Sequence, residues 1–329
     1  MTYYHIYHPE IPPFLAKFVQ APEVKRLQNI GMNCGCEYTA FPLFRGLQPY
    51  SRYDHSIGVA LIVWHFTQIP SQAISGLLHD SASPVFAHVV DFMNGDYLQQ
   101  ESTEAGTEQI IASSPELQEL LQKNGLTTYD VCDHHRYPIA DNDSPMLSAD
   151  RLEYTLGNLI NYGICTIDTV KKFYDDLTVG TNEGNQPEIM FRTMETAEAF
   201  AMAALRCSQI YVSDEDRYAM QILSEILRYA AECGIIHSGD LYTTEPEVIA
   251  KLQHDDKTAP LWEKYRSLAR TVQAESPEIT GEWRKIFAKK RCIDPMVAGK
   301  GRISMLSPAF QDALTQFLHA SQDYWVCGI

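Results

Sequence analysis

Apolar residues recur with a period of about 3.6 along most of this chain, and that pattern restricts its fold more than any other feature. The period is that of an amphipathic helix, which buries one face and exposes the other. Ser213 and Asp214 favour the start of one such helix, and Gly234 favours its end. The segments that show the period most clearly are 55–68, 115–124, 150–163, 169–177, 196–211 and 216–234.

Signals for β-strands are confined to two places. Residues 177–193 carry two β-compatible stretches around an Asn/Gly-rich turn, which is typical of a hairpin. Residues 288–297 and 301–307, separated by a glycine-containing turn, indicate a second small β element. The sequence therefore predicts a mainly α fold with small β-hairpin additions.

Length and composition fit one large domain or two smaller ones. The chain has 329 residues, of which 45% are hydrophobic, and it shows no internal repeat and no low-complexity linker. We expect a helical-bundle core over residues 1–239. A small C-terminal α/β lobe over residues 240–329 is expected to pack on that core.

The charge balance argues against a protein that binds nucleic acids or membrane surfaces non-specifically. The formal net charge is −16, from 26 basic and 42 acidic residues, and such a field opposes binding to polyanions. The longest apolar stretch, 58–66, is about half of a membrane span, and residues 1–18 lack a signal-peptide pattern. We expect a soluble, cytoplasmic protein with reduced cysteines. Cys34 and Cys36 lack a second pair that would complete a zinc site.

A His-Asp pair at His79 and Asp80 closes an apolar helical segment that reads GLLHD. An ionised Asp80 at the end of a buried helix is unfavourable unless it is paired or bound to a cation. Taken alone, the pair has a simpler interpretation: Asp80 caps the next turn and His79 is a satisfied core residue. A second pair, His254 and Asp255, lies in a polar stretch that we expect to face solvent.

Two further segments place polar residues beside helical runs. His55 lies in RYDHSIGV, ahead of the longest apolar run, and Asp150 opens the amphipathic segment DRLEY. Acidic residues are favoured at a helix start by free amides and by the helix dipole, so capping is an alternative role for Asp150. Arg151 and Tyr154 lie within about one turn of Asp150, close enough to serve the same pocket.

Together, the segments RYDHSIGV, GLLHD and SADRLEY resemble the motifs of the HD-domain superfamily of metal-dependent phosphohydrolases in order, spacing and flanking residues. Within the superfamily, the chain is most similar to the deoxynucleoside triphosphate triphosphohydrolase branch, over roughly residues 22–255. The resemblance implies an HD-domain helical bundle. It also implies that one divalent metal ion is held by His55, His79, Asp80 and Asp150.

The implied ligand set fits the implied chemistry. Two imidazoles and two carboxylates suit Fe, Mn, Ni, Mg or Zn. Such an ion lowers the pKa of a bound water and polarises a phosphoryl group, so a ligand such as Asp80 also belongs to the catalytic set. By the same resemblance, Arg52 and Arg151 contact substrate phosphates, which guanidinium groups bind in pairs of hydrogen bonds, and Tyr154 packs against a sugar. Surface salt bridges and core packing are the alternatives.

The chain also departs from the pattern of this branch. Two positions that hold catalytic histidines in the triphosphohydrolases are Ser83 and Gln100 here. An arginine that contacts the substrate and is expected before Tyr211 is missing as well. Without the histidines no general acid is evident, and such a group contributes roughly 10²- to 10⁴-fold in rate.

Two other histidines are candidates for proton transfer or for orienting a phosphate. His88 matches a histidine of the family, and His134 begins the run His134, His135, Arg136. Some HD phosphodiesterases place a histidine pair there, where it binds a second metal or a phosphate. A solvated polar loop is the alternative for this run.

These residues predict a metal-dependent phosphohydrolase that acts on a small phosphorylated substrate, namely a nucleotide or a related phosphate ester. An alternative is a catalytically degenerate HD domain that binds a nucleotide or acts as a regulatory protein. A purely structural helical module is a third interpretation. Assembly into a homo-oligomer is also open, since relatives in this superfamily often assemble.

Overall fold

The computed structural model describes residues 4–94 and 106–329, which form sixteen α-helices and six short strands. The mainly α prediction with small β additions is confirmed. The helices of the first half are α1 (Tyr4–Tyr7), α2 (Pro13–Phe18), α3 (Pro22–Arg26), α4 (Arg52–Thr67), α5 (Pro70–Leu78), α6 (His88–Asn94), α7 (Thr107–Ser113), α8 (Pro115–Lys123), α9 (Ala149–Asn161) and α10 (Ile167–Asp175).

The second half continues with longer helices and contains all of the strands. Its helices are α11 (Met194–Ile210), α12 (Asp214–Glu232), α13 (Glu245–His254), α14 (Ala259–Ser267), α15 (Ile303–Leu306) and α16 (Pro308–His319). The strands are β1 (Leu177–Thr181), β2 (Pro187–Phe191), β3 (Thr271–Ala274), β4 (Met296–Val297), β5 (Gly301–Arg302) and β6 (Trp325–Gly328).

Helix α4 is the centre of the first of two hydrophobic cores. It contacts α1, α5 and α9, and its buried face includes the run Ile57–Val63. The helix begins with a capping box, in which the Ser51 hydroxyl accepts from the Asp54 amide and the Asp54 carboxylate accepts from the Ser51 amide. This reciprocal pair satisfies two backbone donors and determines where α4 starts.

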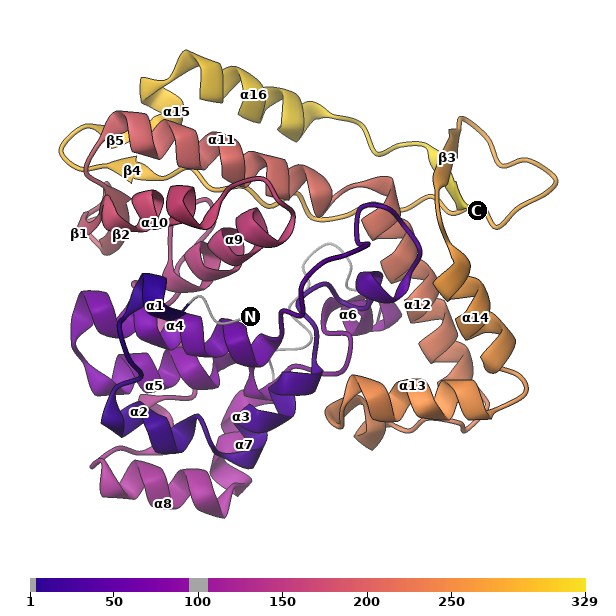
Figure 1. Ribbon diagram of the computed structural model, residues 1–329, viewed down its shortest axis with the longest axis horizontal. Helices are drawn as coiled ribbons and strands as arrows, with labels where there is room; N and C mark the ends of the chain where they lie inside the picture. Colours follow the sequence, from indigo (N-terminus) through magenta and orange to yellow (C-terminus); the bar gives the residue numbers. More distant parts are fainter. Residues whose placement is uncertain (1–3, 95–105) are drawn as a thin grey trace.

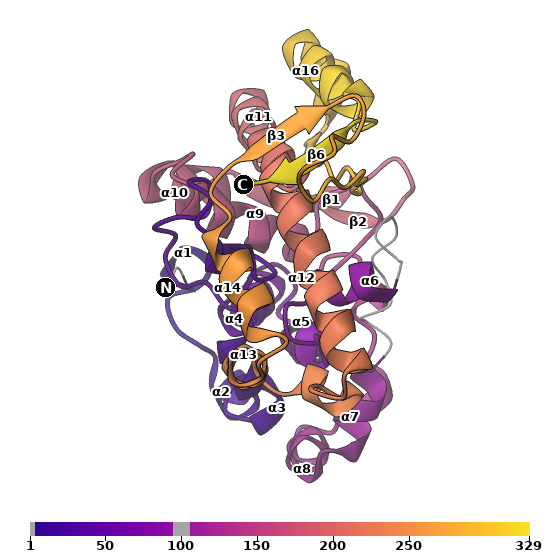
Figure 2. The ribbon, with the colours of Figure 1, turned by 90° about the vertical axis from the view of Figure 1, so that its right-hand side faces the viewer.

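The second core is built around α12, between α6 and α14 (Figure 2). Ser213 caps α12 by accepting from the Asp216 amide, and Gly234 follows the helix at φ 72°, as the sequence predicts. Helices α11 and α16 lie side by side along one edge of the molecule and belong to the first core (Figure 1).

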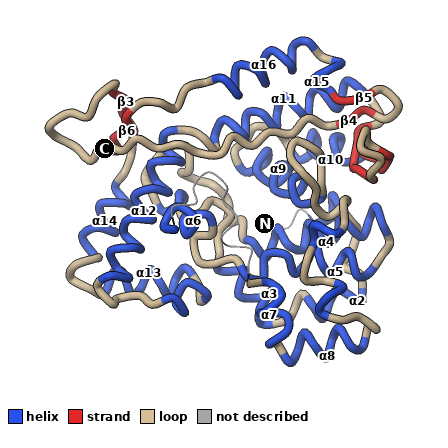
Figure 3. Tube along the Cα trace, turned by 180° about the vertical axis from the view of Figure 1, so that it is seen from behind, coloured by secondary structure: helices blue, strands red, loops and turns tan. Residues whose placement is uncertain are grey.

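The two predicted β segments meet in one sheet with the order β1-β2-β4-β5. Strands β1 and β2 form the antiparallel hairpin, and Phe191 of β2 pairs in parallel with Val297 of β4. Residues 303–306 differ from the prediction, because they form α15 rather than a strand. A second element, the antiparallel ribbon of β3 and β6, was not predicted, and Figure 3 shows it at the opposite end of the molecule.

Residues 240–329 contribute to both cores. Trp262, Ile286 and Val326 belong to the second core, whereas the segment 293–317 supplies buried side chains to the first. The boundary near residue 240 remains a prediction. Among the described residues, no helix combines the length and apolar character that crossing a membrane requires.

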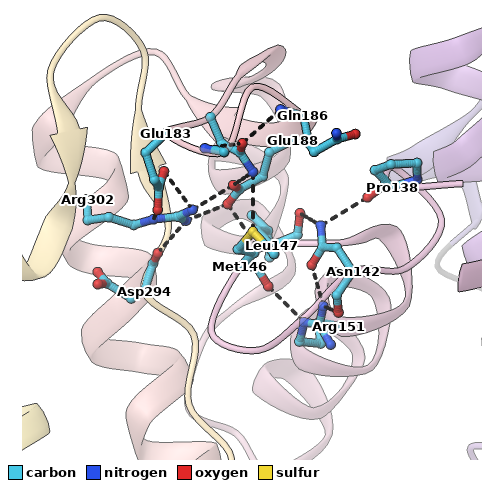
Figure 4. Close-up of polar contacts among 12 residues, drawn as sticks. Pro138, Asn142, Met146, Leu147, Arg151, Glu183, Gln186, Glu188, Asp294 and Arg302 are labelled. Atoms are coloured by element: carbon cyan, nitrogen blue, oxygen red, sulfur yellow. Dashed lines mark hydrogen bonds and ion pairs between the residues drawn. The ribbon is translucent and has the colours of Figure 1, made fainter.

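An ion-pair network joins the sheet to the loop that precedes α9 (Figure 4). Arg302 donates to both carboxylate oxygens of Glu188, at 2.5 and 2.8 Å. The same carboxylate accepts from the Leu147 amide at 3.1 Å. Glu188 is fully buried, so Arg302 neutralises a charge that the interior would otherwise disfavour.

Candidate metal centre

The structure brings together the four side chains that the sequence singles out as metal ligands. His55 comes from the first turn of α4, His79 and Asp80 from the 3₁₀ turn His79–Ala82 after α5, and Asp150 from the first turn of α9. Oδ1 of Asp150 lies 2.9 Å from Nε2 of His55 and 3.6 Å from Nε2 of His79. Oδ2 of Asp80 lies 3.6 Å from Nε2 of His79 and 3.9 Å from Nε2 of His55.

Both histidines direct Nε2 into this gap because Nδ1 is engaged elsewhere. Nδ1 of His55 lies 2.6 Å from Oε2 of Glu153, and Nδ1 of His79 lies 2.7 Å from the carbonyl oxygen of Gly76. A metal-binding histidine typically donates its other ring nitrogen to a carboxylate or a carbonyl in this way. The donor set therefore fits a divalent ion.

The charges at the site also favour a cation. Burial alone would raise the pKa of Asp80, but Arg52 and then His79 outweigh it and hold that pKa well below the usual range. Burial opposes protonation of His55, yet its hydrogen bonds to Asp150 and Glu153 prevail and raise its pKa to about 10. The pocket thus stabilises positive charge, which a divalent ion supplies more compactly than imidazolium groups.

The capping alternative for Asp150 does not hold, because another residue performs that role. Ser148 is the N-cap of α9, and its hydroxyl accepts from the Arg151 amide. Asp150 lies one residue inside the helix, with its carboxylate directed at the two histidines. Asp80 does contact the next turn, since the Ser83 hydroxyl donates to its Oδ1 at 2.6 Å.

Arg52 lies directly beside the site. Its Nη1 donates to Oδ2 of Asp80 at 2.6 Å, and the residue is only 8% exposed. Its Nε is buried and has no hydrogen-bond partner among the described residues. Arg52 therefore neutralises Asp80 and keeps an unused donor.

A second polar group adjoins the first. His134, His135 and Asp141 offer ligand atoms that lie within 4.8 Å of one another, and the ring centroids of His134 and His79 are 5.0 Å apart. Oδ2 of Asp141 lies 2.9 Å from Nδ1 of His135. Burial, together with the charges of His79 and His135, lowers the pKa of His134 to about 4. His134 is therefore neutral near pH 7 and can accept a proton.

Arg151 faces this second group rather than the four proposed ligands. Its guanidinium donates to the Met146 carbonyl at 2.8 Å and to both the carbonyl and side-chain oxygens of Asn142 (Figure 4). It also lies 3.2 Å from Oδ1 of Asp141. Arg151 therefore secures the loop that carries Asp141, and its proposed contact with phosphate stays a prediction.

His88 and Tyr154 complete the set of predicted residues. Nδ1 of His88 lies 2.9 Å from Oδ2 of the fully buried Asp91, and the His88 side chain is 30% exposed. Burial lowers the pKa of His88 despite Asp91, with Arg291 and Arg52 adding to the effect. The Tyr154 ring lies 6.4 Å from that of His55.

Sequence reasoning missed three acidic residues here: Asp91, Asp141 and Glu153. Glu153 follows Asp150 by three positions, so helical spacing alone could have directed attention to it. Asp141 and Asp91 carry no such signal, because only the fold places them beside histidines. Gln100 lies outside the described residues.

Two histidines outside the proposed site, His65 and His237, and the cysteines Cys34 and Cys36 take structural positions. Nδ1 of His65 lies 3.2 Å from the Tyr7 carbonyl, and the His237 side chain accepts from the amide of Asp240 at the start of a 3₁₀ turn. Cys34 and Cys36 are buried thiols, and neither joins a potential metal-binding group among the described residues.

Comparisons with known sequences identify two informative relatives, while no family model matches the chain. The chain is 28% identical over 249 residues to the uncharacterized protein YdhJ of Bacillus subtilis, which covers 75% of this chain and 74% of that protein. It is 23% identical over 321 residues to the metal-dependent phosphohydrolase cns2 of Cordyceps militaris, covering 93% and 88% respectively.

Solved structures share the fold over nearly the whole chain. A phosphohydrolase from Bacteroides thetaiotaomicron superposes with a TM-score of 0.68 at 15% identity, covering 97% of this chain and 96% of that one. A hypothetical protein from Aquifex aeolicus gives a TM-score of 0.66 at 16% identity, with coverage of 97% and 93%. These likenesses concern the fold.

Proposed function

We propose that this protein is a metal-dependent phosphohydrolase of the HD type, with one divalent ion bound by His55, His79, Asp80 and Asp150. The observation that carries the proposal is the convergence of four donor atoms from three separate elements, with both histidine Nδ1 atoms engaged elsewhere. The description of the Cordyceps relative as a metal-dependent phosphohydrolase supports the same activity.

When bound, the ion supplies a more acidic water and Lewis acidity toward a phosphoryl group. Arg52 neutralises Asp80, and its unused Nε would hold a phosphate oxygen of the substrate. His88 and His134 both have lowered pKa values. Being neutral near pH 7, they would accept a proton or orient the substrate.

We propose a nucleotide or a related phosphate ester as the substrate. The rings of Tyr154 and Tyr211, whose centroids are 6.3 Å apart, extend from the proposed metal centre and offer aromatic surface to the organic part of a substrate. A deoxynucleoside triphosphate is the narrower form of this proposal. Ser83 weakens that form, because its hydroxyl donates to Asp80 and replaces a catalytic histidine.

Metal analysis and a substrate panel test the proposal. We expect about one Mn, Fe, Ni, Mg or Zn ion per purified chain, and hydrolysis of at least one nucleoside mono-, di- or triphosphate or phosphodiester. Asp80→Ala should reduce turnover by more than the roughly 10- to 100-fold that is typical of outer-shell residues. Equal turnover by this variant, or no turnover by any form, would refute the hydrolase proposal.

The chain offers a matched control for that variant. His254 and Asp255 form the other His-Asp pair, at the end of α13, so Asp255→Ala should leave metal content and turnover unchanged.

The degenerate alternative rests on the resemblance, in which Ser83 and Gln100 occupy positions that hold catalytic histidines in the triphosphohydrolases. It predicts that nucleotides raise the melting temperature of the metal-loaded protein although none is hydrolysed.

A further inference from the structure

Glu153 is a buried acidic side chain that three partners hold beside the proposed metal centre. It is 2% exposed. Its Oε2 accepts from the Tyr50 hydroxyl at 2.5 Å and lies 2.6 Å from Nδ1 of His55, and its Oε1 accepts from the Tyr7 hydroxyl at 3.4 Å. Since both tyrosines donate to this carboxylate, it acts as an acceptor toward His55 as well.

Two glycines in facing helices make room for this arrangement. A Cβ atom at Gly58 of α4 would lie 2.5 Å from Cγ and Oε1 of Glu153, and one at Gly157 of α9 would lie 2.6 Å from the Tyr50 hydroxyl. Glycine inside a helix costs about 0.5–1 kcal/mol relative to alanine. Gly58 and Gly157 thus lower the intrinsic stability of their helices, but they leave the space that Glu153 and Tyr50 occupy.

We propose that Glu153 is a positioning residue for the metal centre. By accepting from Nδ1–H of His55, it selects the tautomer whose Nε2 lone pair faces Asp80 and Asp150. Tyr50 and Tyr7 hold the carboxylate in place for this purpose. The inference rests on the proposed function, because it requires an ion at His55. In this arrangement Glu153 determines the orientation of the His55 ring and raises the basicity of its Nε2.

Metal affinity is the primary readout, measured by titration calorimetry of the chelator-treated full chain with Mn²⁺. Glu153→Gln keeps the size of the side chain but removes its charge, and we expect binding to weaken by roughly 10- to 100-fold. Gly58→Ala leaves every hydrogen-bonding group in the chain yet displaces Glu153, so it should weaken binding in the same direction.

A buried glutamate elsewhere in the chain is the matched control. Glu245 is also 2% exposed, and it also accepts from a tyrosine, Tyr38, at 2.8 Å, as well as from the Gly31 amide. Glu245→Gln should therefore leave the affinity for Mn²⁺ within about threefold of the wild type. That change is much smaller than the roughly 10- to 100-fold weakening expected for Glu153→Gln.

A second readout separates positioning from simple support of the fold. Long-range ¹H–¹⁵N spectra of histidine-labelled, Zn²⁺-loaded protein should show His55 bound through Nε2 and protonated at Nδ1 in the wild type, and a mixture of ring states in Glu153→Gln. Wild-type Mn²⁺ affinity together with an unchanged His55 tautomer in Glu153→Gln and in Gly58→Ala would overturn the inference and leave the proposed function standing. Failure of the wild-type chain to bind any divalent ion would overturn both.

Discussion

Arg52 places a positive charge in the interior, directly against a carboxylate that we assign to the metal. We expect Arg52→Met to lower the free energy of unfolding of the metal-free protein by ~3–5 kcal/mol, because Asp80 would keep a buried charge without its partner. Mn²⁺ should restore part of this loss by pairing with Asp80. Urea denaturation with and without Mn²⁺ measures both effects. If Arg52→Met lowers the free energy of unfolding by less than about 1 kcal/mol, Arg52 does not neutralise a buried charge on Asp80.

Asp216 gives the protein a pH-sensitive position away from the proposed ligands. Burial raises its pKa to about 8, with Arg217 and a hydrogen bond from Cys36 opposing that shift. A carboxyl group that binds its proton more tightly in the folded state stabilises the fold at low pH, and this contribution is lost as pH rises toward 8. Asp216→Asn should therefore raise the melting temperature relative to wild type at pH 9 but not at pH 5. Equal differences at both pH values would contradict the prediction.

At the residue scale, motif spacing brought out the four donor residues. The structure places ligand atoms of His55, His79 and Asp80 within 4.8 Å of one another, and Asp150 contacts both histidines. Their role as ligands remains a proposal. The direction of Arg151 could not be predicted, because its partners Asn142 and Met146 lie in a loop with no periodic pattern. Glu153 was missed for a different reason. The sequence of a helix does not by itself show whether an acidic residue faces the core or the solvent.

At the element scale, the start of α9 serves both polar groups of the site. The Ser148 hydroxyl accepts from the Arg151 amide and donates to Oδ1 of Asp141 at 2.9 Å. We expect Ser148→Ala to lower the free energy of unfolding by ~1 kcal/mol, the usual effect of losing an N-cap, and also to weaken Mn²⁺ binding.

Thr166 provides the comparison for that variant, since it caps the neighbouring helix α10 by accepting from the Thr169 amide. Thr166→Ala should cause a similar loss of stability in urea and no change in Mn²⁺ affinity. If both variants bind the ion equally well, the start of α9 contributes only to stability.

Long helices and the β1–β2 hairpin were predictable because their signals are local. Periodicity and caps define α12, and an Asn/Gly-rich turn defines the hairpin. The β3–β6 ribbon was not predictable, since its four-residue strands at 271–274 and 325–328 are far apart in sequence and no turn joins them. The segment 303–306 is too short for a periodic pattern to distinguish strand from helix, and in the structure it forms a helix that packs beside α16.

At the scale of the whole molecule, Arg302 connects the C-terminal β elements to the rest of the first core. We expect Arg302→Met to lower the free energy of unfolding by ~3–5 kcal/mol, because Glu188 would remain charged and buried. Arg284 and Glu225 form a more exposed pair, with side chains 33% and 30% exposed, so Arg284→Met should cost about 1 kcal/mol or less. If urea denaturation gives equal losses of unfolding free energy for Arg302→Met and Arg284→Met, the buried ion pair with Glu188 is no more stabilising than the exposed pair.

The path of residues 286–326 has a consequence for how the protein is made. This segment leaves the second core at Ile286, supplies the first core up to Phe317, and returns to the second core at Val326. Both cores are therefore complete only once most of these residues have emerged from the ribosome. During synthesis the sides of α11 and α12 that contact α15, α16 and β6 would stay exposed until translation is nearly finished, which makes the nascent chain a natural client for chaperones that bind unfinished polypeptides.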